Sequence, residues 1–161
     1  MRRVLSVLVE NEPGVLSRVA GLFSGRGFNI ESLNVAPSLE EGLSHMTITT
    51  TGDTGVIEQI VKQLRKLVTV VKVVDFENIV TAEREMMLIK VQADDARRAE
   101  VLHLADIFRC KVVDVGISDL TLEVTGNHEK IQAVIGLLTR FGIREFARTG
   151  TVALRRSMQP E

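Results

Sequence analysis

Residues 3–24 read RVLSVLVENEPGVLSRVAGLFS, and two different apolar periodicities meet within them at a Pro-Gly turn. Arg3–Val9 is a β-rich apolar run that the turn ends, so it predicts a strand. From Pro13 to about Ser24 the apolar residues recur at helical spacing, which predicts an amphipathic helix. Proline suits the first turn of a helix because its missing N–H would have no partner there.

The rest of the first half continues the alternation of strands and helices. Gly25 and Gly27 end the first helix. The Thr-rich run Leu43–Thr51 predicts a strand, and apolar residues between Val56 and Leu67 mark a second helix. Two further strands are predicted at residues 28–36 and 69–76. The resulting order, β-α-β-β-α-β, is that of the ferredoxin-like unit.

The second half of the chain repeats this order. Strands are predicted at residues 86–92, 110–115, 120–125 and 143–148, helices at 96–108 and 127–139, and a short last strand at 151–154. At an offset of 74 residues, Thr51-Gly52-Asp53 falls on Thr125-Gly126-Asn127. We therefore predict an α+β protein with two ferredoxin-like βαββαβ domains in tandem, at residues 1–76 and 86–161, joined by a linker at 77–85.

Domains of this size have small cores. Each would hold about 75–80 residues, with both helices on one face of the sheet. The other face and the exposed edge strand need a cover. We therefore expect an oligomer, or packing of one domain on the other.

Composition excludes several functional classes. The 161 residues carry 20 Lys plus Arg and 21 Asp plus Glu, a net charge of −1, whereas nucleic-acid binders show a basic excess. With no Trp or Tyr and six Phe, the chain is poor in stacking platforms for single strands. Neither a signal-peptide core nor an apolar run of about 18 residues occurs, so we expect a cytoplasmic protein without a membrane segment.

Few side chains offer chemistry. His45, His103 and His128 show no metal-ligand spacing, so we expect no metal site. The single cysteine, Cys110, excludes an internal disulfide framework, and in its apolar strand we expect a structural thiol rather than a nucleophile. We therefore predict no catalytic residue and no cofactor in this chain.

The loop from Asn11 to Val15, between the first strand and the first helix, is the main candidate for a binding site. A helix N-terminus presents free N–H groups and a partial positive charge, which suits a carboxylate. Gly14 lets a ligand approach the backbone, and Asn11 offers a donor and an acceptor. Such a set suits a zwitterion such as a free amino acid, although a plain turn with a helix cap gives the same pattern.

Two blocks of residues carry a family resemblance. Residues 5–19, LSVLVENEPGVLSRV, and 21–33, GLFSGRGFNIESL, closely resemble the opening of the acetolactate (acetohydroxyacid) synthase small-subunit family. The likeness continues through Leu88–Val91, Ile107–Arg109 and Val113–Val115 to Ala147–Gly150, and so covers nearly the whole chain. More loosely, residues 1–76 resemble an ACT domain, an amino-acid-sensing module.

The resemblance implies a regulatory, non-catalytic subunit. The family's large catalytic subunit carries thiamine diphosphate, Mg²⁺ and usually FAD, and it condenses pyruvate with a second 2-oxo acid on the route to valine, leucine and isoleucine. The small subunit raises that activity and confers feedback inhibition, commonly by valine. The implied partners are thus the large subunit and valine or a related amino acid.

The resemblance also implies a homodimer, in which ACT domains pair edge to edge and the amino acid lies between the first loop of one protomer and the second strand of the other. Carried over to this sequence, one side of the site consists of Asn11, Gly14, Val15 and Leu16, and the other side of Asn29 and Ile30. The last two residues begin the second strand, an edge strand in the ferredoxin-like order, where a dimer would pair.

Two other functions share parts of this pattern. A small hydrolase of the acylphosphatase type uses the same scaffold, but it needs a cationic group over its phosphate. The loop Asn11–Gly14 has no Lys or Arg and contains Glu12. An amino-acid-responsive transcription factor would need a helix-turn-helix segment, and ferredoxin-like units already account for both halves.

Overall fold

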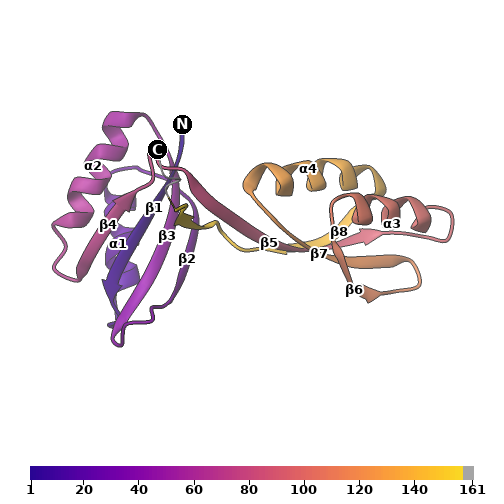
Figure 1. Cartoon of the computed structure of the whole chain (residues 1–161), viewed down its shortest axis with the longest axis horizontal. Coiled ribbons are helices and arrows are strands. Elements are labelled where there is room, and N and C mark those ends of the chain that lie inside the picture. The colour runs from indigo at the N-terminus through magenta and orange to yellow at the C-terminus, as the bar shows by residue number, and fades with distance from the viewer. Residues whose placement is uncertain (158–161) are drawn as a thin grey trace. The chain divides into compact units, whose positions relative to one another are not determined.

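The computed structural model describes residues 1–157 and divides them into two compact units, whose elements are shown in Figure 1. The first unit consists of Met1–Ala82 together with residues 150–157. The second unit is Glu83–Thr149.

The first unit is a four-stranded antiparallel sheet with two helices. Its elements are β1 (Arg2–Glu10), α1 (Val15–Gly25), β2 (Ile30–Pro37), β3 (Leu43–Thr51), α2 (Thr54–Arg65) and β4 (Val70–Asp75). The strand order is β2-β3-β1-β4, so β2 and β4 are the edges. This order confirms the predicted ferredoxin-like unit and the predicted edge position of the second strand.

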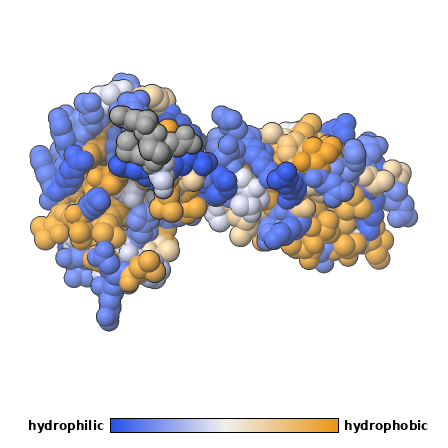
Figure 2. Space-filling view, in the orientation of Figure 1, coloured by the Kyte–Doolittle hydropathy of each residue, from blue (hydrophilic) through white to orange (hydrophobic). Residues whose placement is uncertain are grey.

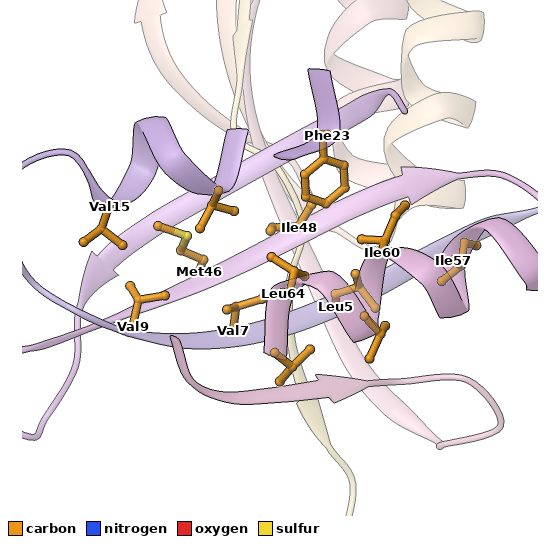
Figure 3. Close-up of a cluster of buried hydrophobic side chains, with 13 residues drawn as sticks. Leu5, Val7, Val9, Val15, Phe23, Met46, Ile48, Ile57, Ile60 and Leu64 are labelled. Atoms are coloured by element: carbon orange, nitrogen blue, oxygen red, sulfur yellow. The ribbon is translucent and has the colours of Figure 1, made fainter. Parts of the chain in front are cut away.

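The core of the first unit lies between its sheet and its helices. Register pairs Leu5 with Ile48 and Val7 with Met46, which places these four buried side chains on one face of the sheet. Phe23 of α1 and the apolar side of α2 pack against them, as Figure 3 shows. Because strand side chains alternate between faces, this pairing also sends Thr47 and Thr49 of β3 to the opposite, helix-free face.

The second unit repeats the architecture. Its elements are β5 (Thr81–Gln92), α3 (Arg98–Ile107), β6 (Lys111–Val115), β7 (Asp119–Gly126), α4 (His128–Leu138), a 3₁₀ turn (Thr139–Phe141) and β8 (Ile143–Arg148). The strand order β6-β7-β5-β8 matches that of the first unit, and α3 and α4 lie on one face (Figure 1). The helix-free face carries Met86 and Leu88, 39% and 41% exposed, and Figure 2 shows apolar residues gathered at the surface of this unit.

The chain divides differently from the prediction. We predicted a linker at 77–85 and gave everything after it to the second domain, but β5 begins at Thr81 and the chain returns to the first unit at Gly150. The last strand, β9 (Val152–Arg155), is confirmed and pairs with β5. The first unit is therefore discontinuous in sequence.

Residues 150–155, which we call the return segment, lie on the first unit. Thr151 and Ala153 are 1% and 5% exposed, and the Thr151 hydroxyl accepts a hydrogen bond from Arg2 Nη2 at 2.9 Å. The Gly150 N–H donates to Asn34 Oδ1 on β2 at 3.3 Å. Part of the helix-free face, where Thr47 and Thr49 are 2% and 1% exposed, is thus buried within this chain.

Candidate functional site

The loop between β1 and α1 lies at the surface at one end of the first sheet. Asn11, Glu12 and Gly14 are exposed. The Asn11 N–H donates to the carbonyl of Gly42 in the β2–β3 turn at 2.8 Å, which fixes the start of the loop. Gly14 has φ 86°, a left-handed conformation that favours glycine, and an added Cβ would meet nothing within 4 Å. The backbone here is thus open to an approaching group.

The N-terminus of α1 differs from those of α2 and α4, each of which has a side-chain cap. Asp53 Oδ1 accepts from Val56 N at 2.9 Å at α2, and Asn127 Oδ1 accepts from Lys130 N at 2.9 Å at α4. Gly14 caps α1 without a side-chain acceptor, and the first turn of α1 contains no acidic residue. The first N–H groups of a helix have no intrahelical partner, so this end suits an external carboxylate.

The two apolar residues predicted at this site point in different directions. The side chain of Val15 is 4% exposed and belongs to the hydrophobic core, so its contribution to a site is limited to its backbone. Leu16 is 46% exposed and remains at the surface. Of this predicted pair, only Leu16 therefore offers an accessible side chain.

Asn29 and Ile30 lie at the opposite end of the same sheet. Ile30 begins β2 opposite Thr50, whereas Glu10, next to the loop, pairs with Leu43. Thr50 lies seven residue steps beyond Leu43 along β3, which is roughly 23 Å at about 3.3 Å per step. One chain therefore does not bring the two predicted halves together, and a shared site requires the loop of one chain to meet β2 of another.

The start of β2 is shaped by local irregularity. The Thr50 hydroxyl donates to the carbonyl of Asn29 at 2.7 Å, which leaves the exposed side chain of Asn29 at the edge. The register of β2 against β3 shifts between Ile30 and Ser32. Such a shift re-aims side chains locally and is common beside functional sites.

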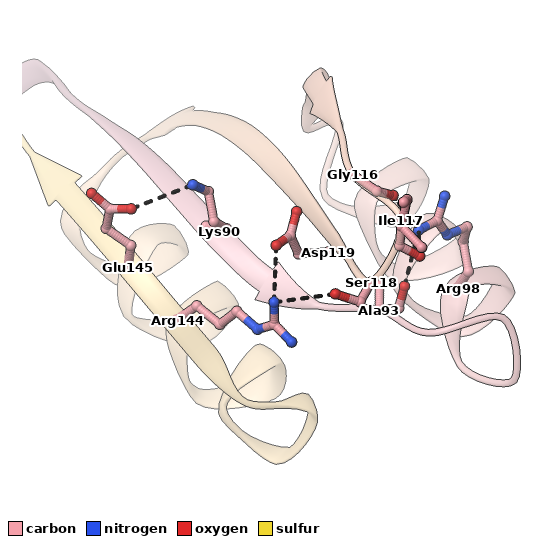
Figure 4. Close-up of polar contacts among 9 residues, drawn as sticks. All are labelled: Lys90, Ala93, Arg98, Gly116, Ile117, Ser118, Asp119, Arg144 and Glu145. Atoms are coloured by element: carbon pink, nitrogen blue, oxygen red, sulfur yellow. Dashed lines mark hydrogen bonds and ion pairs between the residues drawn. The ribbon is translucent and has the colours of Figure 1, made fainter.

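The equivalent loop of the second unit is filled by its own side chains. Asp94 Oδ1 accepts from the N–H of Arg97, the residue before α3, at 3.0 Å. Arg98 Nη2 donates to the carbonyls of Ala93, Gly116 and Ile117 at 3.1, 2.6 and 2.9 Å, contacts drawn in Figure 4. The second unit therefore does not repeat the open loop of the first.

The remaining reactive side chains have structural surroundings. Burial raises the pKa of the Cys110 thiol, and the nearby charge of Lys130 opposes that effect only in part. A raised pKa makes a thiol a poorer nucleophile, as expected of a structural cysteine. Within residues 1–157, His, Cys, Asp and Glu side chains do not gather in threes as a metal site would need. No helix of this part of the chain combines the length and apolar character needed to cross a bilayer.

Known proteins resemble this chain over nearly all of its length. The family described as "AHAS small subunit-like ACT domain" matches residues 5–72, and that described as "Small subunit of acetolactate synthase" matches residues 84–157. The acetolactate synthase small subunit of Aquifex aeolicus is 52% identical over 158 residues, which cover 98% of this chain and 82% of that protein. The chain belongs to the acetolactate synthase small-subunit family.

Other members support this assignment. The acetolactate synthase small subunit of Mycolicibacterium smegmatis is 47% identical over 152 residues, 94% of this chain and 89% of that protein. The crystal structure of the Thermotoga maritima small subunit superposes with a TM-score of 0.89 at 44% identity and covers 99% of both chains. The predicted family and fold are thus confirmed for this small subunit.

Sequence reasoning found the last strand but not the contact of the return segment with β2. Ala147–Gly150 was part of the resemblance, which marked the segment without saying where it lies. Nothing local predicts that Gly150 meets Asn34, because these residues lie 116 positions apart. The sequence signal that could have indicated this contact is the pair Thr47 and Thr49. The structure shows these polar residues buried on a face that we expected to be open.

Proposed function

We propose that this chain is the regulatory, non-catalytic subunit of acetolactate synthase. It activates a large subunit that carries thiamine diphosphate, Mg²⁺ and FAD, and it confers feedback inhibition by valine or a related branched-chain amino acid. Family membership supports the partnership with the large subunit.

The observation that carries the effector site is the N-terminus of α1. The carboxylate of valine binds the N–H groups of the first turn beside Gly14, where this chain supplies no side-chain acceptor of its own. The amide of Asn11 meets the ammonium group, and the exposed Leu16 borders the aliphatic side chain.

Two protomers complete the site. Their first units pair through the β2 edges, because an edge strand offers unpaired backbone donors and acceptors. Asn29 and Ile30 of one protomer then lie opposite the β1–α1 loop of the other protomer and complete the binding site. The separation of the two halves within one chain supports this arrangement, because a single copy cannot bring them to one ligand.

Feedback inhibition follows from differential affinity. A ligand that bridges two chains favours the arrangement that it binds more tightly, and only that preference can alter the activity of the large subunit. Couplings of this kind are typically about 1–3 kcal/mol, or roughly 5- to 150-fold in affinity.

Reconstitution tests the proposal. The purified chain is mixed with a matching large subunit, and acetolactate formation from pyruvate is measured with and without valine, leucine or isoleucine. We expect higher activity than the large subunit shows alone, and inhibition by valine or one of its relatives only when this chain is present. Failure to activate, or inhibition that does not depend on this chain, contradicts the proposed function.

A further inference from the structure

Among residues 1–157, two polar atoms are buried without a hydrogen-bond partner where the return segment contacts β2. Ser32, Asn34, Thr47 and Thr49 share the helix-free face, because register pairs Ser32 with Thr49 and Asn34 with Thr47. Gly150 lies against this group and bonds Asn34 Oδ1 at a long 3.3 Å. Within the described chain, Asn34 Nδ2 and Thr49 Oγ1 are buried without a partner.

The two unpartnered atoms lower the stability of this contact. Burying a polar atom without a partner costs free energy, which the 2.9 Å hydrogen bond from Arg2 to Thr151 and the burial of Ala153 offset. If the segment lifts, water satisfies both unpartnered groups. The free-energy difference between the seated and the lifted segment is therefore smaller than the buried area alone would give, as a switching element requires.

The residues that directly precede the segment are anchored in the second unit. Thr149 exchanges two hydrogen bonds with Met86, from the Thr149 N–H to the Met86 carbonyl at 2.9 Å and from the Met86 N–H to the Thr149 hydroxyl at 3.0 Å. Arg148 Nη2 donates to Glu85 at 2.9 Å, and His128 Nδ1 pairs with the same carboxylate at 3.0 Å. Glu85 is 4% exposed. Gly150 therefore directly follows residues that hydrogen bonds hold in the second unit.

We propose that the return segment is a coupling strap, which seats on Asn34 of β2. Through this contact, binding of the effector at the start of β2 alters the conformation of the second unit. The inference rests on the proposed function, because it needs an amino acid at Asn29 and Ile30, the residues from which β2 leads to Asn34. A ligand that orders the start of β2 lowers the conformational-entropy cost of seating the strap on β2. Valine therefore favours the seated state.

Gly150→Ala and Asn34→Ala test the strap in different ways. An ideal Cβ on Gly150 would lie 3.0 Å from Cβ and Oγ of Ser32 and 3.1 Å from the Leu33 backbone nitrogen. Ser32 and the Leu33 backbone would have to give by a few tenths of an ångström, so alanine weakens the contact of the strap with β2. Asn34→Ala removes the hydrogen bond without a clash. Gly136→Ala, on an exposed turn of α4 where an added Cβ meets nothing within 4 Å, is the matched control.

Three measurements distinguish the outcomes. In the natural small subunit, we expect valine to slow hydrogen exchange of residues 150–155 about five-fold or more. In the two strap variants, we expect valine binding by calorimetry within about five-fold of the natural protein, activation of the large subunit within about two-fold, and less than half of the natural maximal inhibition. The control behaves as the natural protein in all three.

Several results would overturn the strap. These are exchange that valine leaves unchanged, strap variants that remain fully inhibited, and strap variants that no longer bind valine. If Gly150→Ala does not fold, Asn34→Ala and the exchange measurement decide alone. If the natural holoenzyme is not inhibited at all, the proposed function fails first, so the two failures are distinguishable.

Discussion

Gly14→Asp places a fixed carboxylate at the N-terminus of α1, where we propose that the carboxylate of valine binds. The fold tolerates the change, because an added Cβ meets nothing within 4 Å. The φ of 86° costs a non-glycine residue about 1–2 kcal/mol, less for Asp and Asn, and the helix dipole returns roughly 0.3–1 kcal/mol to a carboxylate. We therefore expect a loss of about 1 kcal/mol in the free energy of unfolding.

The effect on the effector is larger. Two carboxylates about 4 Å apart repel by roughly 4 kcal/mol at an effective dielectric constant near 20, or about a thousandfold in affinity. Gly14→Asn is the matched control, because it has nearly the same shape and backbone strain without the charge. We expect calorimetry to show a loss of valine affinity of at least about 100-fold for Gly14→Asp and of about 10-fold or less for Gly14→Asn. Equal losses in both variants, or a Gly14→Asp holoenzyme that valine still inhibits normally, would refute the assignment.

The remaining predictions concern activity, binding and stability. The purified chain, free of large subunit, forms no acetolactate from pyruvate, and measurable turnover would contradict a purely regulatory role. Asn29→Ala weakens valine binding by on the order of 1–3 kcal/mol in calorimetry, because a polar partner is lost, and an unchanged affinity would remove Asn29 from the site. A fragment of residues 1–76 still binds valine but melts at a lower temperature than the full chain. It lacks the return segment and also Glu77, which pairs with the buried Arg3 at 2.7 Å. Equal melting temperatures would show that neither contributes to stability. Phe23→Ala, at a side chain 1% exposed, lowers the free energy of unfolding by about 3–5 kcal/mol in denaturant titrations, and a loss under 1 kcal/mol would contradict its place in the core.

Local patterns predicted the elements of both units well. The alternation in Arg3–Val9 and the helical spacing after Pro13 are properties of neighbouring residues, so β1 and α1 were found within two residues of their bounds. The positive φ of Gly14, at the turn between these two elements, is a conformation that favours glycine. These elements and this turn depend mainly on residues that are close together in the sequence, so the sequence alone predicts them.

The errors concern contacts that are distant in sequence. The two units of the structure differ from the predicted division, because residues after Gly150 return to the first unit and make contacts with β2 and β5 that no local window contains. The resemblance placed Val15 among the ligand residues but did not give the direction of its side chain, which depends on how α1 packs on the sheet. Whether a side chain points into the core or to the surface thus depends on how the elements of the unit pack together.

The discontinuity of the first unit has a consequence for synthesis on the ribosome. Residues 83–149 must all be translated before the return segment exists, about 70 residues, or roughly 4–14 s at about 5–20 residues per second. During that interval the nascent first unit exposes Thr47 and Thr49 to water. Residues 150–157 complete the first unit, so the order of folding does not follow the order of synthesis.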